Sequence, residues 1–121
     1  MSNLTNTKEK GLIEFIVYPD KKEKKYIGVC LTFDIVEEGN TEDEVKRSIL
    51  EAAQLHLMAV IKNNLSEALL NRKAPQEYWD KYEELNASFQ KNKLESVFKA
   101  GGLVSQYFYP YKNAKLISAF A

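Results

Sequence analysis

The first part of the chain alternates between apolar and other positions, a pattern that predicts β-strands. A first strand is expected over residues 11–18, where Ile13, Phe15 and Val17 form one fully apolar face. A proline and the charged run KKEKK follow this strand. Such a run between two strands predicts a solvated turn rather than a helix or a phosphate-binding motif.

A second strand is expected over about Tyr26–Asp34, with apolar odd-numbered positions and small or polar even-numbered positions. Successive side chains of a strand point to opposite faces, so the odd-numbered set is predicted to face the core. The even-numbered set is predicted to face water or a binding partner. The residues up to Glu38 allow a short third strand or a bulge.

The start of a helix is the most clearly specified local feature. Thr41 is expected to cap a helix that begins at Glu42, and Glu44 completes a capping box. Apolar residues then recur at spacings of three and four as far as about Lys62: Val45, Ile49, Ala52, Ala53, Leu57, Val60 and Ile61. This stripe predicts an amphipathic helix on the sheet, and therefore an α+β fold in which a small antiparallel β-sheet packs on a long helix.

The C-terminal half carries weaker patterns. Pro75 and the aromatic residues after it predict a short helix to about Leu85. Its aromatic stripe is expected to pack on the sheet or on a second subunit, and a ligand platform is the alternative. Residues 94–100 and 103–109, joined by two glycines, resemble a β-hairpin that Pro110 would end. Residues 1–121 are expected to form one domain, with a core over residues 11–62 and a C-terminal extension over residues 63–121.

Composition narrows the class of protein. The chain has 121 residues, 45% of them hydrophobic and 28% charged, which is typical of soluble globular proteins. The polar N-terminus lacks the apolar centre of a secretory signal, and no apolar run reaches the length of about 18 residues that a membrane span needs. The single cysteine, Cys30, is expected to be a buried apolar side chain. A cytoplasmic location is therefore predicted.

Charge is balanced over the whole chain but segregated along it. There are 17 basic and 17 acidic residues. Residues 37–51 carry six acids against Lys46 and Arg47, whereas residues 86–121 carry five lysines against Glu95. Helix starts favour acids and surface loops favour lysine, which accounts for the pattern without a function. The alternative is a pair of patches of opposite sign, each suited to a partner of the other charge.

Groups that could perform catalysis are sparse. The only histidine, His56, lies at the edge of the helix stripe and is expected to be packed or partly exposed. The clustered carboxylates are adjacent rather than spaced around an ion, so no metal or cofactor is predicted. A ribonuclease H-type reaction needs about three or four carboxylates around two magnesium ions. Glu14, Asp34 and Glu51 are too scattered for that, so the sequence predicts a binding protein and not an enzyme.

The order of these parts resembles the HicB-like antitoxin family. The resemblance covers residues 11–61 and rests on the strand YIGVCLTFD, the turn and helix start GNTEDEV, and the helix ILEAAQLHL. It implies a β-β-β-α-β core, a partial ribonuclease H-like fold without nuclease carboxylates, here with a C-terminal helix and hairpin extension. It also implies an antitoxin that neutralises HicA, a small basic ribonuclease toxin. Members that bind DNA carry an added helix-turn-helix or ribbon-helix-helix; no such pattern is visible here, so DNA binding is doubtful.

Two functions of different classes follow, and a purely structural homodimer is a third. A homodimer is the expected assembly. In the first function, a small basic toxin binds the acidic segment and the even-numbered side of the second strand, with candidate residues Tyr26, Thr32, Asp34, Glu37 and Glu38. In the second, the basic and aromatic C-terminal segment binds single-stranded nucleic acid by stacking and charge, with candidate residues Lys99, Tyr107, Tyr109, Tyr111 and Lys112.

Overall fold

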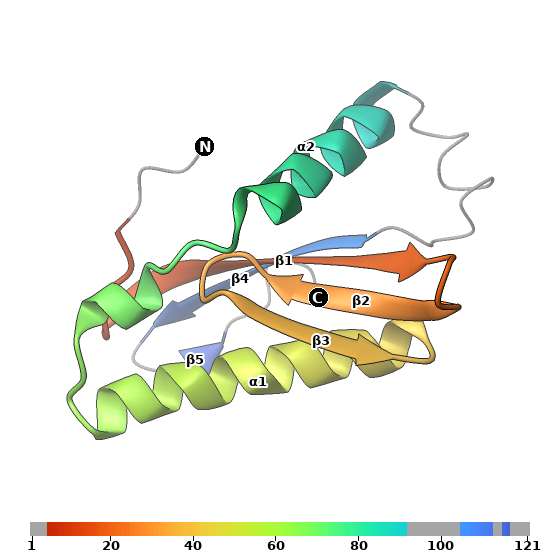
Figure 1. Ribbon diagram of the computed structural model, residues 1–121. Helices are drawn as coiled ribbons and strands as arrows, with labels where there is room; N and C mark the ends of the chain where they lie inside the picture. Colours follow the sequence, from red (N-terminus) through yellow and green to blue (C-terminus); the bar gives the residue numbers. More distant parts are fainter. Residues whose placement is uncertain (1–4, 92–104, 113–114, 117–121) are drawn as a thin grey trace.

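The computed structural model describes residues 5–91, 105–112 and 115–116. Along the chain it contains β1 (Lys10–Asp20), β2 (Lys25–Cys30), β3 (Ile35–Gly39), α1 (Glu42–Lys62), the 3₁₀ helix η1 (Glu67–Leu70), α2 (Gln76–Lys91), β4 (Ser105–Lys112) and β5 (Lys115–Leu116). The strands form one antiparallel sheet in the order β3-β2-β1-β4-β5. The α+β class is confirmed, and α1 and α2 lie on opposite faces of the sheet (Figure 1).

Helix α1 begins and ends as the sequence predicts. The Thr41 hydroxyl accepts a hydrogen bond from the Glu44 backbone N–H at 3.1 Å. At the other end Asn64 adopts a left-handed conformation (φ 49°), and its N–H donates to the Ile61 carbonyl at 3.2 Å. The Leu65 N–H donates to the Val60 carbonyl at 2.8 Å. These two bonds form a Schellman motif, which satisfies the last carbonyls of the helix and turns the chain towards η1.

The buried stripe of α1 packs on the odd-numbered side of β1. Ile13 and Phe15 are buried there, and Phe15 also meets the ring of Tyr109 edge-on at 5.5 Å between centroids. The same core cluster contains the helix residues Ile49, Ala53, Leu57 and Val60. The apolar stripe of the helix therefore packs on a face of the sheet, as predicted, and the face it covers is the fully apolar face of β1.

A second core cluster fills the space between the sheet and α2. Ile16, Val29 and Leu31 are buried on this face of the sheet. The backbone also ties the segment before α2 to the sheet, because the Ala74 N–H donates to the Leu31 carbonyl at 3.0 Å. The aromatic residues of α2 that pack on this cluster are Tyr78, Trp79 and Tyr82. Their packing on the sheet is one of the arrangements that the sequence left open.

The expected orientation of β2 is wrong on its even-numbered side. Gly28 and Cys30 are buried, and they lie under α1 rather than facing water or a partner. A Cβ atom added to Gly28 would lie 2.5 Å from Val45 Cγ1. The small residues of β2 therefore allow the helix to approach the sheet closely. A glycine inside a strand often occurs where another backbone or helix comes close. Both faces of β2 are core faces.

Gly28→Ala is expected to destabilise the protein by about 1–3 kcal/mol, because the new methyl group overlaps a stiff β-branched side chain. Val45→Ala removes the Cγ1 atom that the new methyl group would overlap. The double variant Gly28→Ala/Val45→Ala should therefore lose less unfolding free energy than the sum of the losses of the two single variants. Urea unfolding of the four proteins measures this coupling as a double-mutant cycle. Strict additivity of the two losses would contradict the close approach of α1 to β2.

The ends of two strands lie several residues from the positions expected. β2 ends at Cys30, and residues 31–34 form a turn in which Asp34 has a positive φ of 60°. β4 continues through Pro110, which was expected to end it, and pairs with β1. On the outer side of β4, β5 pairs with Tyr111 and Lys112 and not with Pro110. The missing N–H of the proline therefore removes no hydrogen bond to β5. The other arm of the expected hairpin, residues 94–100, lies outside the described residues.

Candidate functional site

Strand β3 forms one edge of the sheet. It pairs with β2 on one side, and within residues 5–91, 105–112 and 115–116 no strand pairs with its other side. Val36 in the middle of the strand is 40% exposed. Exposed acids precede and follow it, so we define the acidic edge as Asp34, Val36, Glu38, Asp43 and Glu44.

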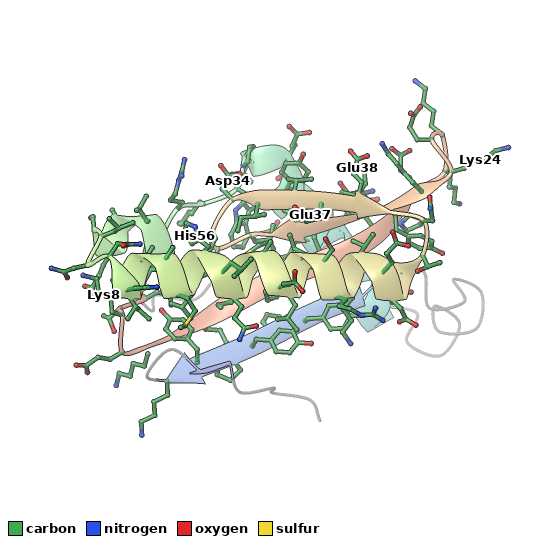
Figure 2. All side chains as sticks on the ribbon, turned by 90° about the horizontal axis from the view of Figure 1, so that it is seen from below. Lys8, Lys24, Asp34, Glu37, Glu38 and His56 are labelled. Carbon is green, nitrogen blue, oxygen red and sulfur yellow. The ribbon has the colours of Figure 1, made fainter. Side chains whose placement is uncertain are left out.

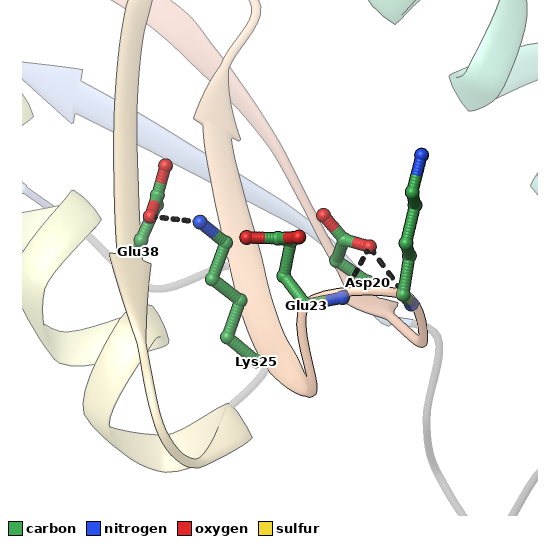
Figure 3. A network of polar contacts seen from close by, with 5 residues as sticks. Asp20, Glu23, Lys25 and Glu38 are labelled. Carbon is green, nitrogen blue, oxygen red and sulfur yellow. Dashed lines mark hydrogen bonds and ion pairs between the residues drawn. The ribbon is translucent and has the colours of Figure 1, made fainter.

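The two adjacent glutamates of β3 point to opposite faces. Glu37 points towards α1, where its carboxylate accepts a hydrogen bond from the Ser48 hydroxyl at 2.6 Å. Glu38 points to the other face and forms an ion pair with Lys25 of β2 (Figure 3). The hydrogen bond to Glu38 is the largest cause that raises the pKa of Lys25. Glu37 therefore holds β3 on the helix, whereas Glu38 stays exposed and solvated.

The other residues predicted to bind a partner separate into two groups. Asp34 lies in the turn just before β3, Glu37 and Glu38 lie in the strand (Figure 2), and Tyr26 lies beside them because it pairs with Gly39. Thr32 lies apart. Its hydroxyl accepts a hydrogen bond from the Glu14 N–H at 2.9 Å, which ties the turn after β2 to β1. Four of the five residues therefore lie at the β3 edge of the sheet, with Glu37 and Glu38 on opposite faces, and the fifth, Thr32, has an internal contact.

The tyrosines predicted to stack on nucleic acid lie on the α1 side of β4. Tyr111 is 2% exposed, and its hydroxyl donates to the Thr7 carbonyl at 2.6 Å. Burial raises the pKa of Tyr111 to about 12. Tyr109 is half-buried against Phe15. A base cannot stack on the buried Tyr111 ring while it holds these contacts.

The remaining members of this predicted surface are also dispersed. The Tyr107 hydroxyl donates to a Glu42 carboxylate oxygen at 3.3 Å, and Lys46 Nζ lies 4.2 Å from the centre of the Tyr107 ring. Lys112 is exposed at the end of β4, and Lys99 lies outside the described residues. In the part of the chain that is described, β4 uses its alternate tyrosines to pack against α1 rather than to present a stacking platform.

The potential nucleophile and the potential base are both packed. Cys30 is buried, as expected, and its burial raises the pKa of the thiol to about 12, which keeps it protonated. His56 is half-buried, and its Nε2 lies 2.7 Å from the Leu69 carbonyl. Its ring also packs on Phe33, with centroids 4.8 Å apart. Both side chains therefore have structural contacts that explain their presence.

The three scattered carboxylates do not meet. Glu14 lies on the α2 face of β1, where burial raises the pKa of its carboxyl. Asp34 is exposed in the turn before β3, and Glu51 is exposed on α1, which covers the opposite face of the sheet. Among the described residues, no three His, Cys, Asp or Glu side chains are grouped so that they could hold a metal ion. These positions give no shared site for two magnesium ions.

Two exposed apolar surfaces were not singled out from the sequence. One is Val36 on the acidic edge, and the other is formed by Leu55 and Met58 on the outer side of α1, which are 63% and 43% exposed. Leu55 and Met58 fall outside the apolar stripe of the helix. A leucine and a methionine three residues apart on the polar side of an amphipathic helix are a signal that the sequence does contain.

Comparisons with known proteins do not assign the chain to a family. No protein-family model matches it, and no significant match is found among curated proteins or among solved structures. None of the described helices has the length and apolar character needed to cross a membrane.

Proposed function

We propose that this protein is a non-catalytic protein-binding module of the HicB-like antitoxin type, and that its partner binds the acidic edge. The observation that carries this proposal is that no other described strand pairs with the outer side of β3, in whose centre Val36 is exposed. An edge strand presents unpaired backbone N–H and C=O groups, to which another chain can add a strand. The exposed valine supplies an apolar contact on one face of that added strand.

The charge around the open edge favours a basic partner. Between Asp34 and Glu44 the chain carries six acids and no lysine or arginine. Lys25 forms an ion pair with Glu38, and the Ser48 and Tyr107 hydroxyls donate to the Glu37 and Glu42 carboxylates. Asp34, Asp43 and Glu44 are exposed, so this edge presents negative charge to the solvent. A concentrated field of one sign accelerates encounter with a partner of the opposite sign and selects against acidic partners.

The resemblance gives the partner a class, a small basic HicA-type ribonuclease toxin. The chain order β1-β2-β3-α1 and the position of β1 between β2 and β4 support the β-β-β-α-β core that this resemblance implies. On this proposal the protein acts in the cytoplasm, covers the RNA-binding surface of the toxin and performs no chemistry of its own. The packed states of Cys30 and His56 are consistent with that role.

The test compares two variants with the same change of charge. Glu38→Lys reverses an exposed acid on the acidic edge, and Glu84→Lys reverses an exposed acid on α2. The tagged full chain is used to capture a small basic protein from its own cells, which is then purified and titrated against all three proteins. The captured protein should cleave RNA, and the parent chain should inhibit that cleavage.

We expect Glu38→Lys to weaken binding and inhibition about tenfold or more, and Glu84→Lys to leave both nearly unchanged. Binding of the parent should also weaken as salt rises. If no small basic protein is captured, or if the two variants bind it equally, the acidic edge is not the binding surface and the proposal fails.

A further inference from the structure

The outer side of α1 carries an apolar centre with charged ends. Leu55 and Met58 lie on the side of the helix directly away from the sheet, where they are 63% and 43% exposed. Glu51 and Lys62 lie on the same side, four residues before Leu55 and four residues after Met58. Residues three and four apart share one face of a helix, so the four side chains form a continuous stripe. Figure 2 views the molecule from this side, with α1 across the sheet.

The stripe reads acid, leucine, methionine, lysine from the N-terminal to the C-terminal end. It is therefore complementary to a second copy of itself that runs in the opposite direction. If two copies of α1 pack antiparallel about a two-fold axis between Leu55 and Met58, each leucine meets the methionine of the other copy. The same arrangement places Glu51 opposite Lys62 of the second copy, and Lys62 opposite Glu51. An isologous interface requires this reciprocity, because the same patch serves on both subunits. Helices crossing at about 20° keep such pairs close along the stripe.

The two charges cannot satisfy each other within one chain. Glu51 and Lys62 are eleven residues apart on α1, which separates them by about 16 Å along the helix axis. Neither takes part in an ion pair with another of the described residues. A charge pair between two copies would therefore add an interaction rather than replace one.

We infer that the outer stripe of α1, formed by Glu51, Leu55, Met58 and Lys62, is a homodimer interface that binds a second copy of this chain in antiparallel orientation. This inference does not depend on the proposed function, since the stripe and the acidic edge share no residue. The patch is small and made by one helix pair, so the dimer is expected to be weak and to dissociate on dilution. Its two acidic edges would both remain accessible to partners.

The test exploits the reciprocity of the charges. In a two-fold dimer Glu51→Lys places two positive charges together at each end, and Lys62→Glu places two negative charges together. The double variant Glu51→Lys/Lys62→Glu has the net charge of the parent and recreates both pairs with reversed sign. Analytical ultracentrifugation over a concentration series measures the dissociation constant of each full-length protein. Circular dichroism and thermal unfolding check that each variant is folded, because Lys62→Glu also places an acid at the helix C-terminus.

We expect the parent to dimerise, each single reversal to raise the dissociation constant about tenfold or more, and the double variant to recover most of the loss. Leu55→Asp, at a position already exposed, should abolish the dimer while leaving the chain folded. A parent that stays monomeric at high concentration overturns the inference. So does a dimer that the reversals leave intact, which would place the interface on β3 or on the C-terminal segment, or a folded double variant that does not recover.

Discussion

Phe15→Ala is expected to lower the free energy of unfolding by about 3–5 kcal/mol, a large part of the roughly 5–15 kcal/mol that holds a domain of this size together. Phe15 is 1% exposed in the middle of β1. It packs under α1 and meets the Tyr109 ring edge-on, so its removal opens a cavity between three elements and ends an aromatic contact. Guanidinium unfolding followed by circular dichroism measures the loss.

Val36→Ala is the matched control for this substitution. Val36 also lies in a strand but is 40% exposed, so its truncation should change the free energy of unfolding by no more than about 0.5–1 kcal/mol. Similar losses for the two variants would mean that the space between the sheet and α1 is not the principal core of the protein.

Asn6→Ala is expected to cost at least about 2 kcal/mol, although it removes only a small polar side chain near the N-terminus. The Asn6 amide is buried and makes three bonds: its nitrogen donates to the carbonyls of Leu12 and Leu70 at 3.1 and 2.9 Å, and its oxygen accepts from the Leu12 N–H at 2.9 Å. Alanine leaves these backbone groups without partners, and each buried polar group left unpaired costs about 1–3 kcal/mol.

Hydrogen exchange gives a local measurement for the same variant. The Leu12 amide should exchange faster in Asn6→Ala, while the amides that join the centres of β1 and β2 stay protected until the protein unfolds globally. Thr5→Ala, next to Asn6 but exposed, is the control and should leave both the stability and the Leu12 amide unchanged. Unchanged protection at Leu12 in Asn6→Ala would show that the Asn6 side chain does not hold the start of β1.

The elements that the sequence predicted well are those defined by local chemistry. The bounds of α1 follow from the Thr41 cap and from the end of the apolar stripe at Lys62, and both match the structure. The core face of β1 follows from simple alternation. The error in β2 has a physical cause, because a small residue inside a strand is compatible with water and also with a closely packed helix. Alternation gives the two faces of a strand but not what covers each of them.

The candidate site was predicted in part for the same reason. Asp34, Glu37 and Glu38 are close in sequence, so their proximity in and just before β3 follows from local order. The position of β3 at the edge of the described sheet does not follow from local order. It depends on the long-range pairing of β4 with β1 rather than with β3. The assignment of Tyr111 to a binding surface failed because aromatic residues suit a core as well as a ligand platform.

The sequence by itself determined the long helix, its cap and its buried stripe, the alternation of β1 and the acid-rich segment after β2, because each depends on residues within a few turns or a few strand positions of one another. Only the tertiary structure decided that α1 lies against Gly28, that α2 covers the other face, and that β3 lies at the edge of the described sheet. These outcomes depend on which distant apolar surfaces bury each other best. The same tertiary choices leave Leu55 and Met58 exposed on α1 and Val36 exposed on β3, the two surfaces to which we assign binding.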